Sequence, residues 1–137
     1  LKGNPLEVSQ KDGTHIVYIW GYQQSQPIAK IVNATYNQVA SYVANLQNLS
    51  NLDNDRTLAG AGKEGALRSA LNNLRTVSVL SNAQITTYTY DPLIGVTSIT
   101  DASGQVVYYQ YDAHHRLQFV KDKDGNILKE NQYNYKH

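Results

Sequence analysis

Residues 104–126 of this chain read GQVVYYQYDAHHRLQFVKDKDGN. Aromatic and β-branched residues fill two short runs in this stretch, and a turn containing Gly flanks each run, which is typical of β-strands. The signature Tyr109-Gln110-Tyr111-Asp112 repeats an earlier one, Tyr88-Thr89-Tyr90-Asp91, at a distance of 21 residues. The same spacing separates Gly104 from Gly125. Features that share one period within a short stretch indicate an internal repeat.

Each repeat unit is expected to consist of two short strands joined by a turn. The alternation in residues 87–90 puts both of their tyrosines on one side of a strand. Aspartates recur at the equivalent turns, at Asp91, Asp101, Asp112 and Asp122. Aspartates that recur with the period of the repeat are better explained by a turn that every repeat contains, because a catalytic pair of carboxylates usually occurs once in a protein. We therefore expect these carboxylates to accept backbone amides rather than to cleave glycosides.

Composition divides the chain into three zones within one predicted domain, residues 1–137. Residues 1–32 form a predicted β-hairpin region, in which Asp12-Gly13 lies between two strand-forming runs. Residues 33–82 form a helical insertion, and residues 83–137 hold the tyrosine–aspartate repeats. The end of this last zone, Tyr133-Asn134-Tyr135, continues the series of tyrosines.

The first zone fits the template of the repeats. Residues 22–31 overlay residues 111–120 without gaps, and Asp12-Gly13 then corresponds to Asp124-Gly125. The helical zone is therefore expected to interrupt one continuous β array.

Residues 33–82 have the apolar spacing of two helices. The first stripe consists of Tyr36, Val39, Val43 and Leu46, widened by Tyr42 and Leu49. Asn33 or Thr35 can cap this helix. After a polar loop at residues 50–65, a second helix is expected from Glu64 to about Val77, with the stripe Leu67, Ala70, Leu71, Leu74 and Val77. The predicted fold is mainly β, an antiparallel ribbon of hairpins with an inserted two-helix hairpin.

The repeat units resemble those of the Rhs/YD-repeat family, whose pattern is approximately G-x(3–9)-Y-x-Y-D-x-x-G-R-L-x-x-V. The best copy runs from Gly104 through the second signature to Arg116-Leu117 and Val120. His115 stands where the family has Gly, and His tolerates a positive φ. Residues 18–31 and 87–101 are similar to the carboxyl-terminal end of very large Rhs-type proteins of the Bacteroidetes. The resemblance implies a sheet ribbon wrapped into a hollow shell, in bacterial toxins or in cell-surface proteins.

The bulk composition excludes several classes of protein. Charged residues make up 17% of the chain and the net charge is +1, which leaves no basic stripe for nucleic acid. Because there is no Cys, disulfides and thiolate zinc sites are excluded. No apolar run approaches the roughly 20 residues that cross a bilayer. The chain is rich in Tyr, with 11 residues. Because it has no Met and so no start codon of its own, we expect a fragment or processed product of a larger protein.

Three short motifs imitate functional sites without the residues that those sites require. Residues 122–126 open like a calcium loop, but Ile127 and Tyr133 stand where Gly and a bidentate Glu are needed, so a hairpin turn is predicted. Residues 60–64 resemble a phosphate loop but have Glu in place of the Mg²⁺-binding Ser or Thr, which favours a flexible link before a helix. His114-His115 is predicted to lie in a surface turn. No catalytic residue, cofactor or metal site is therefore predicted.

The leading prediction for function is a non-enzymatic structural end piece of a secreted or cell-surface Rhs/YD-repeat protein, acting as shell or scaffold beside the rest of a larger chain or a protein partner. One alternative is a module that binds a carbohydrate or another surface ligand on exposed rings, namely Trp20, Tyr22, Tyr109 and Tyr111. Another is exported cargo recognised through its carboxyl-terminal segment by secretion machinery. We expect the tyrosines chiefly to stack on one another across strands, at about 0.5–1 kcal/mol per pair.

Overall fold

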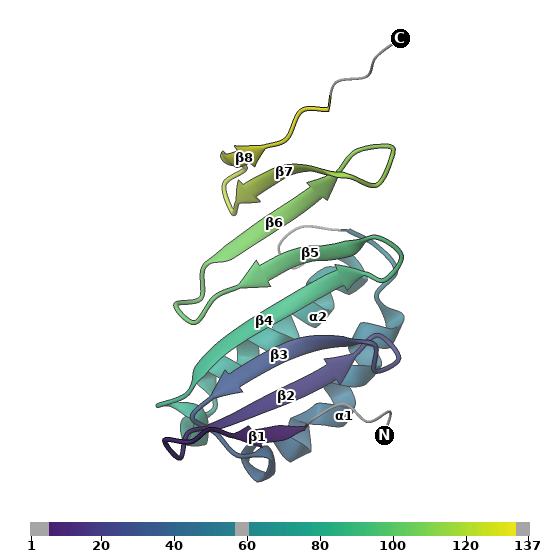
Figure 1. The fold of residues 1–137 in the computed structure, drawn as a ribbon. Helices are drawn as coiled ribbons and strands as arrows, with labels where there is room; N and C mark the ends of the chain where they lie inside the picture. Colours follow the sequence, from purple (N-terminus) through teal and green to yellow (C-terminus); the bar gives the residue numbers. More distant parts are fainter. Residues whose placement is uncertain (1–5, 57–60, 134–137) are drawn as a thin grey trace.

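The strands of this protein form one antiparallel sheet whose spatial order follows the chain (Figure 1). The structure, a computed structural model, describes residues 6–56 and 61–133. The eight strands are β1 (Glu7–Ser9), β2 (His15–Gly21), β3 (Gln26–Val32), β4 (Gln84–Asp91), β5 (Gly95–Thr100), β6 (Val106–Tyr111), β7 (Leu117–Asp122) and β8 (Ile127–Glu130). Each strand pairs with the next, so the sheet is a ribbon of consecutive hairpins.

The chain leaves the ribbon once, between β3 and β4, to form the helices. These are α1 (Tyr36–Leu52) and α2 (Gly62–Asn73), followed by two 3₁₀ turns, η1 (Leu74–Thr76) and η2 (Ser78–Leu80). After this excursion β4 pairs directly with β3, with Ala29 opposite Thr87. The predicted mainly β fold with an inserted helical hairpin is confirmed.

Both helices cover the same face of the sheet, behind β1–β5 in Figure 1, while β6–β8 extend beyond them. The core lies between these layers. The sheet contributes Val17, Ile19, Ala29, Ile31 and Ile85, and the helices contribute Val39, Val43, Leu46, Leu67 and Leu71. Burial of each large aliphatic side chain contributes about 1.5–3 kcal/mol, so the helices are held by their apolar stripes.

Some details of the helical prediction are confirmed and others are wrong. Thr35 is the N-cap of α1, and its backbone amide donates to Oε1 of Gln38 at 2.9 Å. Tyr42, predicted to widen the buried stripe, is 38% exposed. Helix α1 extends through Leu52, into the predicted loop, and α2 already begins at Gly62. The predicted link at residues 60–64 is therefore partly helical, and Gly60 lies outside the described residues.

Four of the hairpin turns share one geometry. In three of them a glycine takes a positive φ, namely Gly13, Gly104 and Gly125 at +90°, +88° and +84°. In the fourth, between β6 and β7, His115 takes the same place with φ of 63°. His115 thus adopts the backbone conformation that the family's Gly would have, and His114 and His115 are both exposed in a surface turn, as predicted.

Three of the recurring aspartates hold turns of this geometry, namely Asp101, Asp112 and Asp122. The carboxylate of Asp91 instead accepts one backbone amide, from Leu93, and pairs with Arg56. Oδ1 of Asp122 accepts the backbone amides of Asp124 and Asn126, each at 2.9 Å. Asp101 and Asp112 accept two backbone amides in the same manner within their own turns. The loop that imitates a calcium site is therefore a hairpin turn. These carboxylates accept backbone amides at separate turns.

The register corrects the predicted alignment of the amino-terminal zone. A β-bulge immediately precedes Tyr90 in the pairing of β4 with β5, Tyr111 in that of β6 with β7, and Trp20 in that of β2 with β3. Trp20, rather than Tyr22, therefore occupies the position of Tyr111. The overlay of residues 22–31 on 111–120 is off by two residues in β2 and by one residue in β3, because the turn after β2 is one residue longer than the turn after β6.

Candidate functional site

The predicted ligand-stacking aromatics do not share one environment. Trp20, Tyr109 and Tyr111 point to the face of the sheet opposite the helices and are partly buried. Tyr22, in contrast, begins the turn after β2 with φ of 52° and is only 4% exposed. Its hydroxyl donates to Oδ2 of Asp53 at 2.6 Å. Tyr22 is therefore a core residue that cannot stack on a ligand, and this part of the prediction is wrong.

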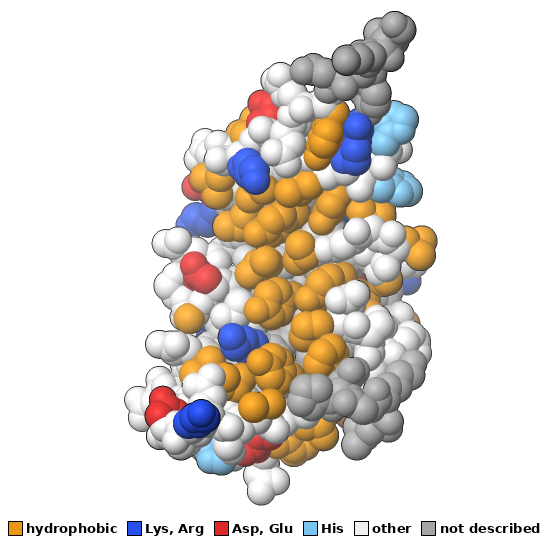
Figure 2. Space-filling view, in the orientation of Figure 1, with side chains coloured by type: hydrophobic (Ala, Val, Ile, Leu, Met, Phe, Trp, Pro, Cys, Tyr) orange, Lys and Arg blue, Asp and Glu red, His pale blue; other side chains and the backbone are white. Residues whose placement is uncertain are grey.

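The face that the helices leave uncovered, here called the open face, carries the remaining aromatic rings. Figure 2 shows hydrophobic side chains in a nearly continuous band across it. Strand alternation places the following residues there: Tyr18, Trp20, Tyr88, Tyr90, Val96, Ile99, Val107, Tyr109, Tyr111 and Val120. The band arises because each repeat presents aromatic residues at equivalent positions.

The ring contacts on the open face run along single strands. Tyr88 and Tyr90 stack with their centroids 6.3 Å apart, and Tyr18 and Trp20 are also 6.3 Å apart. These two contacts thus lie within a strand instead of across strands, whereas Tyr90 also meets the buried Tyr22 ring edge-on at 5.5 Å. Each ring shields its neighbour, so these side chains are half-buried without a ligand.

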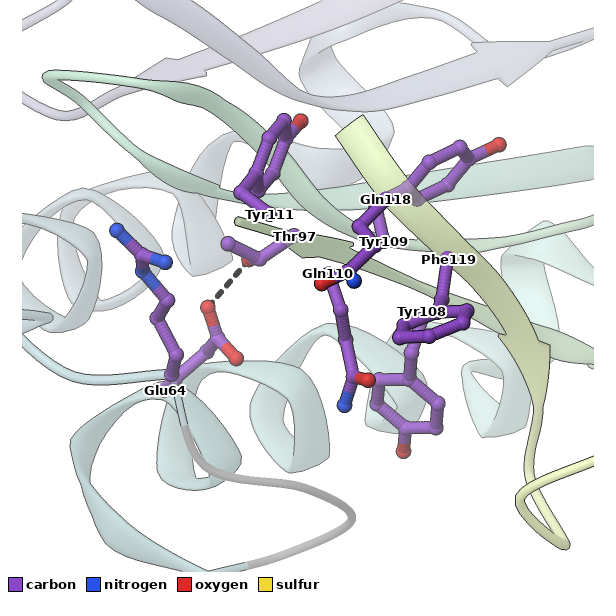
Figure 3. Close-up of a pocket in the computed structure, with 9 residues that line it drawn as sticks. Glu64, Thr97, Tyr108, Tyr109, Gln110, Tyr111, Gln118 and Phe119 are labelled. Carbon is purple, nitrogen blue, oxygen red and sulfur yellow. Dashed lines mark hydrogen bonds between the residues drawn. The ribbon is translucent and has the colours of Figure 1, made fainter. Parts of the chain in front are cut away.

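A pocket lies on the other face of the sheet, between the first turn of α2 and strands β5–β7 (Figure 3). Its volume is about 280 Å³. Figure 3 shows Tyr108, Gln110 and Phe119 on the side of the sheet that faces Glu64, whereas the rings of Tyr109 and Tyr111 project to the opposite side. Tyr109 and Tyr111 therefore border the pocket mainly through their backbone.

Glu64 is the most deeply buried charged residue at this pocket, with 1% of its surface exposed. One of its carboxylate oxygens accepts a hydrogen bond from the Thr97 hydroxyl, and the other lies 2.7 Å from Nη2 of Arg68. Arg68, 4% exposed, also donates from Nε to Oγ of Ser98 at 3.2 Å and lies over the Tyr108 ring. The carboxylate is thus fixed between a helix and the bulge of β5.

Burial controls the protonation of this cluster. Loss of hydration raises the pKa of Glu64 to about 7, although the hydrogen bond from Thr97 and the charge of Arg68 both act to lower it. Burial likewise raises the pKa of Asp53. Glu64 therefore exchanges its proton near neutral pH.

The pocket offers one buried carboxyl group, the partly exposed guanidinium of Arg56, side-chain amides and aromatic rings. Within residues 6–56 and 61–133, no three His, Cys, Asp or Glu residues are grouped so that they could hold a metal ion. The arrangement supports hydrogen bonding to a polar group in the pocket.

Glu64, Arg68 and Thr97 were not identified from the sequence as site residues. The signal that could have found them is helical spacing: Glu64 and Arg68 lie four residues apart and flank Leu67 on the apolar face of α2. Two opposite charges on an apolar helix face are expected to pair with each other when they are buried, because a buried charge without a partner is costly. The contribution of Thr97 depends on the bulge in β5, for which the local sequence gives no signal.

Comparison with known proteins identifies the repeat. Residues 95–127 match the model of the RHS Repeat family. The matched segment runs from the first residue of β5 to the first residue of β8 and includes the second tyrosine–aspartate signature. No curated protein and no solved structure matches the chain. In the described part of the chain, no helix is long and apolar enough to span a membrane. The hairpin ribbon and its recurring turns agree with this match, so residues 95–127 of the chain form an RHS repeat.

Proposed function

We propose that this chain is a non-enzymatic structural segment of a larger secreted or cell-surface bacterial Rhs/YD-repeat protein, acting as shell or scaffold. Rhs repeats are structural units and occur in extracellular and cell-surface proteins. The observation that carries the proposal is the unbroken sheet. The matched repeat pairs with β4 on one side and with the rest of β8 on the other, so it is built into a longer ribbon.

The edges of the ribbon support the same proposal. All residues of β1 and β8 are exposed, and Ile127 and Leu128 in β8 are 52% and 58% exposed. Exposed strand edges with apolar side chains are favourable sites for pairing with a further strand. The inserted helices cover the other end of the sheet and give it a core. A larger repeat chain would cover these edges.

The test compares this chain with the longer gene product that the proposal requires. Hydrogen exchange at the backbone amides of β1 and β8 is expected to slow in the longer product, while exchange in β3 and β4 stays the same. The proposal is wrong if the gene encodes no further repeats or if neither edge gains protection. A panel of glycoside, peptide and phosphoester substrates tests the non-enzymatic role, because turnover abolished by Glu64→Gln would contradict it.

The open face favours a second candidate function, binding of a glycan or another surface ligand to its aromatic rings. Contiguous exposed apolar surface often marks an interaction site. Glycan-array binding that is lost in Trp20→Ala and Tyr109→Ala would support this function. Tyr42→Ala is the matched control, because Tyr42 is exposed on helix α1, on the other side of the sheet. Equal loss in all three variants, or no binding at all, would reject it.

A further inference from the structure

The pocket beside Glu64 combines side chains from four separate elements. Helix α2 supplies Glu64, β5 supplies Thr97, β6 supplies Tyr108 and Gln110, and β7 supplies Gln118 and Phe119. Glu64 is distant in the sequence from the residues of β5–β7, and they come together because β5 bulges and α2 packs against the sheet. The pocket exists only in the folded protein.

The polar groups of the pocket have unused hydrogen-bonding capacity, and the Glu64 carboxylate among them is held in place by two partners. Thr97 and Arg68 each occupy one position on the Glu64 carboxylate, whose two oxygens accept about four hydrogen bonds in all. The side-chain amides of Gln110 and Gln118 form no hydrogen bond within the described residues. Each amide offers two donor hydrogens and an acceptor oxygen. The pocket therefore presents donors and acceptors that a ligand could satisfy.

Charges at the pocket are already balanced. Glu64 pairs with Arg68, and Arg56, which also lines the pocket, pairs with Asp91 at 2.7 Å. An ionic ligand would have to disrupt one of these pairs, and disruption of the buried pair is costly. A neutral ligand would leave both ion pairs intact. The rings of Tyr108 and Phe119 add apolar surface beside these polar groups.

We propose that this pocket binds a neutral, polyhydroxylated ligand, such as a single saccharide ring, between Glu64 and the amides of Gln110 and Gln118. Hydroxyl groups both donate and accept, which suits a carboxylate beside two amides, and the C–H face of a sugar ring suits an aromatic side chain. Small-molecule pockets generally measure about 300–1,000 Å³. At about 280 Å³ this pocket has room for one ring rather than for an extended chain. The proposal is independent of the structural role proposed above and concerns the face opposite the open-face aromatics.

Titration of isotope-labelled protein with neutral monosaccharides, followed by amide chemical shifts, tests the proposal. We expect shifts in residues 64, 110 and 118, and no such shifts with the matched sugars that carry a carboxylate or an amine. Gln110→Leu and Gln118→Leu are each expected to weaken binding about tenfold or more, since each leaves sugar hydroxyls without partners. Gln84→Leu is the matched control, because Gln84 is exposed on β4 outside this pocket.

The variants separate the possible results. If no neutral monosaccharide shifts these residues at millimolar concentration, the proposal is wrong. It is also wrong if the Gln110 and Gln118 variants bind as well as Gln84→Leu, or if binding is instead lost on Trp20→Ala and shifts appear on the open face. Deoxy sugars test the same contacts from the ligand side without altering the protein. Weaker binding of deoxy sugars to the unaltered chain supports the proposal, and equal binding contradicts it.

Discussion

The Tyr22 hydroxyl links two segments that lie far apart in the sequence, because it donates to Asp53 at 2.6 Å and accepts the backbone amide of Tyr90 at 2.9 Å. Asp53 caps the end of α1, and Tyr90 lies in β4. One phenol thus connects the helical insertion to the sheet. Its burial raises the pKa of Tyr22 well above the usual value, so the hydroxyl keeps its proton at every physiological pH.

Replacement of this hydroxyl is expected to destabilise the protein. Tyr22→Phe removes the hydrogen bond to Oδ2 of Asp53, which keeps the bond from the Asp55 amide to Oδ1. It also removes the acceptor of the Tyr90 amide. The loss is expected to cost about 1–3 kcal/mol. Urea unfolding followed by circular dichroism measures the loss. Tyr42→Phe is the control, since Tyr42 is 38% exposed and its change is expected to fall within about 0.5 kcal/mol. Equal stability of the two variants would show that the linkage is unimportant.

The buried carboxyl group of Glu64 predicts a stability that falls as pH rises. The pKa of Glu64 is about 7 in the folded protein, whereas a Glu in the unfolded chain has a pKa of 4.5. The folded state therefore binds the proton more tightly than the unfolded state does. The stabilising contribution of this carboxyl group is complete below pH 4.5 and is lost as pH rises through about 7, at up to about 1.4 kcal/mol per pH unit. Urea unfolding between pH 4.5 and 8 measures this slope.

Glu64→Gln should flatten that slope, because the amide does not titrate. A residual slope of the same sign is expected from Asp53, whose pKa burial also raises. Glu130→Gln on the exposed strand β8 is the control and should retain the full slope. An unchanged slope in Glu64→Gln would mean that this carboxyl group does not govern the pH dependence.

The turn between β6 and β7 offers a stabilising substitution. His115 has φ of 63°, a conformation that costs a residue with a side chain roughly 1 kcal/mol and costs Gly little. His115→Gly is therefore expected to raise the free energy of unfolding by up to about 1 kcal/mol, as measured by thermal and urea unfolding. His114→Gly, in the same turn without a positive φ, should be neutral or destabilising. A larger gain in stability from His114→Gly than from His115→Gly would contradict this account of the turn.

The role of the recurring aspartates can be tested in the last hairpin. Asp122→Ala removes the acceptor of two backbone amides and of the Asn126 side chain, so a lower free energy of unfolding is expected. The bonds from these groups also lower the pKa of Asp122, and this stabilisation is lost as pH falls below about 4. Asp124→Ala keeps the backbone amide and is the matched control, expected to change stability little. Similar losses in both would refute a special role for Asp122.

Much of this fold was predicted correctly from short-range patterns. The 21-residue period, the alternation of tyrosines and the Asp and Gly residues of the turns predicted the hairpins of β4–β8, and apolar stripes predicted both helices. These features depend on neighbouring residues, since strand alternation and turn geometry are local properties of the chain. The candidate site was harder to predict, because Glu64 and Gln118 line one pocket only after α2 packs against the sheet.

The sequence by itself determined the repeat and the positions of the turns, because each is specified within a few residues of the chain. Only the tertiary structure decided which aromatic residues are exposed and which charges are buried. Tyr22 lies in the core and Trp20 on the open face, although both belong to one aromatic run, because a left-handed turn reverses the direction of one side chain. The buried Glu64 likewise accepts a hydrogen bond from Thr97, 33 residues away, and no local sequence pattern indicates such a contact.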